Sequence, residues 1–236
     1  MDHSPGILDL AIMIALCGAS PVADARWIYP RFLRAVAASP PGARPRWYLP
    51  FVSLTSWAFT GAVIVMWVAY RRPWAALYIR PSRPLGVWLG TGLAVLYAAA
   101  VWRQVRAVLA KPDGRARLAR KLASAGALLP HTAAERRGFV LVSLTAGICE
   151  EVLFRGFVMW YCAAFTGPVV AVALSSLLFG FGHLYLGPTH ILRSGLVGLA
   201  LAGIVIAGGS LWPAIVLHAT IDLVAGELGY AALSQT

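Results

Sequence analysis

The stretch Glu150-Glu151-Val152-Leu153-Phe154-Arg155 stands inside a long apolar segment that otherwise has the composition of a membrane span. A lone ionised side chain at the bilayer centre costs from a few to more than ~10 kcal/mol. Such groups are kept there only when they pair, line a cavity or take part in chemistry. The stretch therefore favours a membrane bundle with a polar interior, in which neighbouring helices supply partners for these three side chains.

The composition supports a membrane protein. Of the 236 residues, 59% are hydrophobic and 12% are charged, against roughly 25% charged in an ordinary soluble domain. The net charge is +11, and eighteen of the twenty lysines and arginines precede residue 138, where they flank apolar segments. This arrangement favours contact with anionic lipid headgroups and argues against nucleic acid as a partner. We expect an all-α fold, a polytopic membrane helical bundle.

The apolar segments predict about seven transmembrane spans. The first covers residues 7–22; it is short and broken by Asp9, so it could either cross the membrane or be re-entrant, and a basic loop is expected at 23–47. The remaining spans are expected at 48–70, 86–102, 138–164, 169–185, 191–208 and 212–227. The 86–102 segment covers about 26 Å at ~1.5 Å per residue, which is short but adequate for a crossing.

The polar stretch between the third and fourth spans has a helical period. Its apolar residues recur three or four apart, at Leu118, Leu122, Ala125 and Leu129, while most of the basic side chains fall elsewhere on the helix. This pattern predicts a basic amphipathic helix on the membrane surface, ended by Pro130. A solvated linker is the alternative interpretation.

We divide the chain into an N-terminal transmembrane region with basic loops, 1–125, and a C-terminal membrane core, 126–236, which contains the Glu150–Arg155 stretch. The distribution of cations places the 103–137 segment in the cytoplasm by the positive-inside rule. The short loops and the high Arg, Ala and Gly content are typical of a bacterial protein. The expected location is therefore the bacterial inner (plasma) membrane.

Helical geometry separates the two glutamates of the opening stretch. Glu151 and Arg155 are four residues apart, so they share a face and can pair. Glu150 is rotated by about 100° and points elsewhere, where it could face a cavity and act as a general base. An ion-pair cluster that only packs helices together is the structural alternative.

Two later spans carry further ionisable groups. His183 ends the fifth span, and His218 and Asp222 share a face of the seventh, where Asp222 could orient His218. A glutamate, two histidines and an aspartate could also bind a metal, although there is no His-Glu-x-x-His motif. The three cysteines form no Cys-x-x-Cys pair and fit small buried residues better than a nucleophile.

Three motifs, in order and on separate spans, resemble those of the CPBP intramembrane proteases, also called the CAAX-protease and bacteriocin-processing or Abi family. The first, Glu-Glu-x-x-x-Arg, corresponds to Glu150, Glu151 and Arg155. The second, Phe-x-x-x-His, corresponds to Phe179 and His183, and the last, His-x-x-x-Asn or His-x-x-x-Asp, to His218 and Asp222. The resemblance covers roughly residues 130–226.

The resemblance implies a glutamic-type intramembrane endopeptidase, without a metal or other cofactor, that acts on a membrane-tethered, hydrophobic or lipidated peptide or protein. In this reading Glu150, helped by His183, activates water, Glu151 and Arg155 support Glu150, and His218 donates to the oxyanion. Family members with Asn at the last position have a second donor there; Asp222 must either be protonated or only orient His218. The alternatives are a non-proteolytic membrane scaffold or regulator on the same fold, a metal-dependent membrane hydrolase and a proton-coupled transporter.

Overall fold

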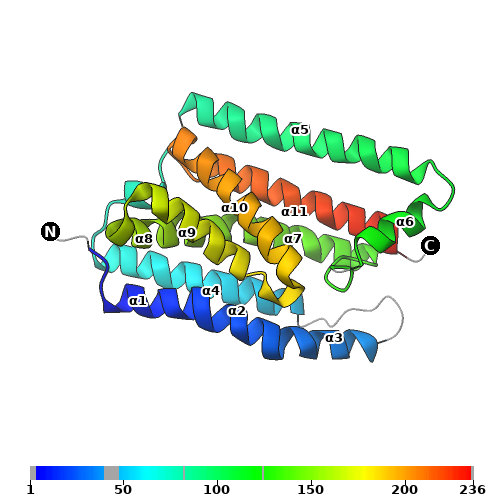
Figure 1. Ribbon diagram of the computed structural model, residues 1–236, viewed down its shortest axis with the longest axis horizontal. Coiled ribbons are helices and arrows are strands. Elements are labelled where there is room, and N and C mark those ends of the chain that lie inside the picture. Colours follow the sequence, from blue (N-terminus) through cyan, green and yellow to red (C-terminus); the bar gives the residue numbers. More distant parts are fainter. Residues whose placement is uncertain (1–3, 40–47, 82, 124, 235–236) are drawn as a thin grey trace.

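The computed structural model describes residues 4–39, 48–81, 83–123 and 125–234, and over these ranges the protein is helical, without strands. The long helices run side by side along one axis (Figure 1). The N-terminal helix and α4 (Tyr48–Ala69) form one edge of the bundle, and α5 (Pro84–Leu109) forms the other. Between them lie α7 (Ala133–Glu150), η4 (Glu151–Val158), α8 (Met159–Thr166), α9 (Pro168–Phe181), α10 (Pro188–Gly208) and α11 (Trp212–Leu233).

Five of the described helices are long and apolar enough to cross a membrane: Ile7–Ala37, Pro50–Ala69, Pro84–Leu109, Pro188–Gly208 and Trp212–Leu233. The all-helical membrane bundle is thus confirmed, with five candidate spans. The crossings expected at 138–164 and 169–185 stay predictions. The first coincides with the helix that carries Glu150, Glu151 and Arg155, and the second with α9, whose 14 residues extend only about 21 Å at ~1.5 Å each.

The N-terminal helix is longer than the sequence predicted. It runs from Ile7 to Ala37 as α1 (Ile7–Ile14), η1 (Ala15–Ala19), α2 (Ser20–Ala23), η2 (Asp24–Ile28) and α3 (Tyr29–Ala37). The loop expected at 23–47 is therefore wrong for residues 23–37, and residues 40–47 lie outside the described ranges. Pro21 and Pro30 do not break this helix, because each follows a π-helical segment, whose wider turn accommodates the ring and the missing N–H.

Asp9 does not interrupt this helix. Its carboxylate is completely buried and accepts two hydrogen bonds of 2.7 Å from the two terminal nitrogens of Arg72. The guanidinium of Arg72 also stacks on the rings of Tyr70 and Trp160, 4.7 and 4.5 Å from its Cζ. The ion pair therefore ties the start of the N-terminal helix to the segment that follows α4.

The amphipathic stretch is shorter than expected. Helix α6 covers Gly114–Lys121, and the chain continues in turns, so the helix ends at Lys121 and not at Pro130. The apolar side of α6 packs inside the protein, where Leu118 joins Val105 of α5 and Ala232 of α11. Its position on the membrane surface stays a prediction.

Small residues bring the central helices together. A Cβ added to Gly147 on α7 would lie 2.9 Å from the Cβ of Ala219 and 3.0 Å from its backbone nitrogen. A Cβ added to Gly198 on α10 would lie 2.9 Å from Nη2 of Arg155. The backbones of α7 and α11 can touch only because position 147 lacks a side chain, and the same property of position 198 leaves room for a buried arginine.

Candidate active site

The fold brings together the six ionisable residues that the motifs identify. Glu150 ends α7, and Glu151 and Arg155 lie in η4, a π-helical segment whose eight residues are all buried. His183 follows the C-terminal end of α9, and His218 and Asp222 lie on α11. π-Helical segments within α-helices are frequent at functional sites, because the wider turn changes the direction of the following side chains.

Glu151 is the centre of a buried ion cluster. Its Oε1 accepts a hydrogen bond of 2.8 Å from Nη1 of Arg155 and one of 2.7 Å from Nδ1 of His218. The side chains of Glu151 and Arg155 are both completely buried, and that of His218 is 6% exposed. The pairing of Glu151 with Arg155 is the one that their spacing predicted, and the bond to His218 links two helices distant in sequence.

The orientation of His218 differs from the sequence interpretation. That interpretation gave the orienting role to Asp222, but Oδ2 of Asp222 is 3.8 Å from Nε2 of His218, beyond hydrogen-bond distance. Glu151 holds the ring instead, because the close approach of Gly147 to Ala219 brings α7 against α11. A carboxylate only accepts hydrogen bonds, so Nδ1 of His218 carries a proton. Its Nε2 faces Asp222 and also Glu150, whose Oε2 lies 3.8 Å from Nε2.

Phe179 packs between the charged groups. The Cζ of Arg155 lies 4.2 Å from the centre of its ring, a cation–π contact. The ring meets those of His183 and His218 edge-on, at centroid separations of 5.1 and 5.8 Å. The phenylalanine of the second motif therefore fixes the positions of an arginine and two histidines by shape, without a hydrogen bond from its own side chain.

His183 has a defined tautomer when its ring is neutral. Its Nδ1 lies 3.0 Å from the carbonyl oxygen of Phe179. A carbonyl oxygen accepts and cannot donate, so Nδ1 must carry the proton and Nε2 keeps a lone pair. His183 thus has an acceptor nitrogen available for a water or a substrate N–H.

A cavity of about 160 Å³ lies beside this cluster, lined by Glu150 and His183 among other residues. At roughly 30 Å³ of liquid volume per water, it has room for a few water molecules. The side chain of Glu150 is 28% exposed, whereas that of Glu151 is completely buried. The two adjacent glutamates therefore have the different environments that their rotation around the helix predicted.

Further lining residues belong to none of the three motifs. The N-terminal helix contributes Asp24 and Tyr29, α4 contributes Phe51 and Phe59, and η5 (Leu184–Leu186) contributes Tyr185. The sequence interpretation missed Asp24 and Tyr29 because it placed them in a loop. Extension of the first helix beyond residue 22 would have shown Asp24 as a further carboxylate within a mostly apolar helix, the same signal that identified Glu150.

Metal binding was one of the alternatives raised by the sequence. Within the described ranges, no three His, Cys, Asp or Glu side chains are arranged as a set that could hold a metal ion. Nε2 of His218 lies 3.8 Å from Oε2 of Glu150 and 3.8 Å from Oδ2 of Asp222, and both distances are too long for hydrogen bonds.

Residues 134–224 match the family model described as "Type II CAAX prenyl endopeptidase Rce1-like". This range contains all six candidate residues, and the match confirms the resemblance that the three motifs suggested. No curated protein and no solved structure matches the chain. Together with the five apolar helices, the family match identifies an integral, multi-pass membrane protein.

Proposed function

We propose that this protein is a glutamic-type intramembrane endopeptidase that hydrolyses a peptide bond of a hydrophobic or membrane-tethered substrate. The observation that carries the proposal is that Glu150, at the end of α7, and His183, in the turn after α9, line one cavity within an apolar bundle. The family match over residues 134–224 supports peptide hydrolysis as the reaction. A cavity of this kind supplies the water and the polar surroundings that lipid excludes.

In the proposed reaction Glu150 takes a proton from a water in the cavity, while Nε2 of His183 accepts its second hydrogen bond. The water oxygen bonds to the scissile carbonyl carbon, and the carbonyl oxygen becomes an oxyanion. When the tetrahedral intermediate collapses, the carbon–nitrogen bond breaks and Glu150 returns its proton to the leaving amine. The net change is the addition of one water molecule to the peptide bond.

The buried cluster supports the oxyanion side of this reaction. Nε2 of His218 can donate to the oxyanion only when both ring nitrogens carry protons, because Nδ1 already donates to Glu151. Glu151, held by Arg155, compensates the positive charge of such a ring. In this proposal Glu151 and Arg155 are positioning residues that act through His218, and Asp222 is a second, protonation-dependent donor.

The proposal extends to the setting of the enzyme. The substrate is a hydrophobic or lipidated peptide or protein, the remaining partners are membrane lipids, and no metal or nucleic acid is required. The location is the bacterial inner membrane, with the seven expected crossings, and the catalytic core is residues 126–236. The concentration of cations in the 103–137 segment supports the cytoplasmic side for that segment.

The test uses the full-length protein in phospholipid vesicles with a library of fluorophore-quencher hydrophobic peptides. Glu150→Gln and His183→Ala should each lower kcat/KM for any cleaved peptide by about 10²–10⁴-fold. Glu227→Gln is the matched control, because Glu227 forms an exposed ion pair with Arg136 and should leave cleavage unchanged. Full activity of Glu150→Gln would overturn the assignment.

The same preparation separates the alternatives. Activity that is lost on chelation and restored by a divalent metal would identify the metal-dependent hydrolase. For the scaffold alternative, Glu150→Gln should still complement a deletion strain. Comparison of membrane peptides from wild-type, deletion and Glu150→Gln strains would then identify the natural substrate.

A further inference from the structure

The cavity has a carboxylate that the three motifs do not include. Asp24 is the first residue of η2 in the N-terminal helix, and it lines the same cavity as Glu150 and His183. Its side chain is partly exposed. Within the described ranges the carboxylate of Asp24 makes no hydrogen bond or ion pair, whereas that of Asp9 in the same helix is paired with Arg72.

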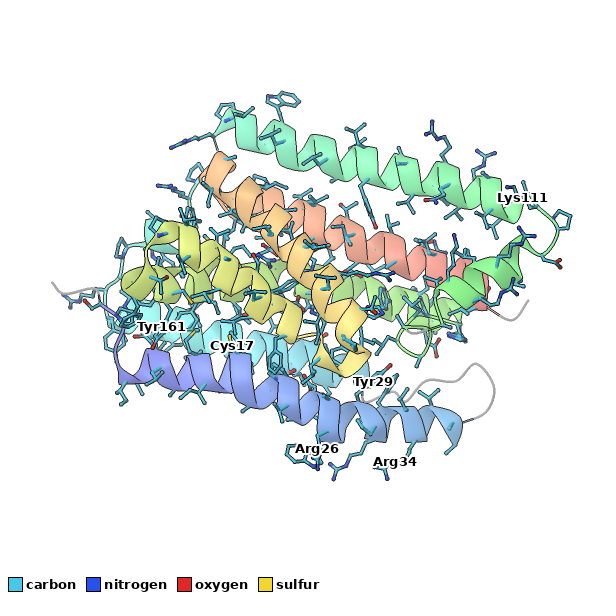
Figure 2. All side chains as sticks on the ribbon, viewed as in Figure 1. Cys17, Arg26, Tyr29, Arg34, Lys111 and Tyr161 are labelled. Atoms are coloured by element: carbon cyan, nitrogen blue, oxygen red, sulfur yellow. The ribbon has the colours of Figure 1, made fainter. Side chains whose placement is uncertain are left out.

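The charge of the cavity is opposite to that of the chain. Asp24 and Glu150 are part of its lining, and that lining, within the described ranges, includes no Lys or Arg, although the chain has a net charge of +11. The nearest cations in sequence, Arg26, Arg31 and Arg34, are exposed. Figure 2 shows Arg26 and Arg34 pointing away from the bundle. The N-terminal helix therefore presents its carboxylate to the cavity and its cations to the surroundings.

The rest of the lining suits the flat and apolar parts of a long cationic side chain. It is rich in aromatic rings, contributed by Tyr29, Phe51, Phe59, Phe154, Phe179 and Tyr185. Aromatic faces attract a guanidinium or ammonium group, and a carboxylate in apolar surroundings binds such a group more strongly than one in water. The hydroxyls of Thr55 and Ser56 are neutral and donate to carbonyls of their own helix.

We propose that Asp24 is a specificity-determining residue that accepts the side chain of a lysine or arginine of the substrate, close to the scissile bond. The inference rests on the proposed function and adds a substrate class to it: hydrophobic peptides with one basic residue near the cleavage site. Asp24 takes no part in the hydrolysis itself, for which Glu150 and His183 supply the water-activating groups.

The test is a charge exchange in phospholipid vesicles. A cleaved hydrophobic peptide is made with Lys, Gln or Glu at each position within about four residues of the scissile bond. At one such position the wild-type protein should cleave the Lys peptide on the order of tenfold faster than the Gln peptide, as kcat/KM, and the Glu peptide more slowly still. Asp24→Asn should abolish the preference, and Asp24→Lys should reverse it toward Glu.

Two controls separate specificity from structure. Asp24→Glu keeps the charge and should keep the preference for Lys, and Glu227→Lys changes an exposed carboxylate outside the cavity and should do the same. Equal loss of rate for all three peptides in Asp24→Asn would overturn the inference, as would a wild-type protein with no charge preference. If no peptide is cleaved in a Glu150-dependent way, both the proposed function and this inference are overturned. If cleavage depends on Glu150 but not on the charge of the peptide, only this inference is overturned.

Discussion

Nδ1 of His218 lies 2.7 Å from Oε1 of Glu151, and this hydrogen bond joins two helices whose residues are 67 positions apart in the chain. The same oxygen accepts from Arg155, so one carboxylate orients both an imidazole and a guanidinium in a site closed to solvent. Glu150, its neighbour, is left to face the cavity. The adjacent glutamates thus have different surroundings, one closed to solvent and one partly exposed, and this difference has measurable consequences.

Removing Glu151 should destabilise the protein far more than removing an exposed carboxylate. Glu151→Leu leaves the charge of Arg155 buried and unpaired, which typically costs about 3–5 kcal/mol. Glu227→Gln breaks an ion pair whose two side chains are 48% and 44% exposed, and should cost less than about 1 kcal/mol. Chemical unfolding in detergent measures both. Equal stabilities of the two variants would contradict the central role of Glu151 in the cluster.

A methyl group at position 147 should separate α7 from α11. In Gly147→Ala the new Cβ would lie 2.9 Å from that of Ala219, and we expect a loss of about 1–3 kcal/mol together with lower activity, because His218 moves away from Glu151. Gly203→Ala on α10 is the control, since its Cβ would meet nothing within 4 Å. That variant should be neutral or gain about 0.5–1 kcal/mol of stability. Unfolding curves and the peptide-cleavage rate of both variants test the prediction.

The Asp9–Arg72 pair should behave as a buried ion pair that holds the cavity wall. Asp9→Ala leaves Arg72 unpaired and should destabilise the protein by about 3–5 kcal/mol, whereas the double variant Asp9→Leu/Arg72→Met should recover much of this loss. Since the N-terminal helix lines the cavity, cleavage should fall in the single variant and return in the double one. Additive losses in the double variant would show that the two side chains act independently.

Asp222 should be exchangeable for its amide. Asp222 lies 3.8 Å from His218 and makes no hydrogen bond to it, so Asp222→Asn should keep the cluster intact. If the side chain at this position donates to the oxyanion, the amide can do so at any pH, but the carboxyl only while protonated. The ratio of the cleavage rate of Asp222→Asn to that of the wild-type protein should then rise with increasing pH. A ratio that stays constant with pH would assign Asp222 no donor role.

Much of the site was predictable because its motifs are local and periodic. The 100° rotation per residue of a helix is enough to pair Glu151 with Arg155 and to point Glu150 elsewhere, and both features are present. The errors concerned the N-terminal helix. A basic loop was expected from residue 23, but the helix continues through its two π-helical segments to Ala37, and Asp9 suggested a break where a distant Arg72 neutralises it.

Hydropathy and helical period are properties of neighbouring residues, so they predict the membrane bundle, the order of the motifs and the face of the helix on which each charged residue lies. The packing of distant helices cannot be predicted in this way, and it is this packing that places Glu151 and not Asp222 against His218 and brings Asp24 to the cavity. Contacts between helices depend on how closely their backbones approach. That approach is set by pairs such as Gly147 and Ala219, which no periodicity within one segment reveals.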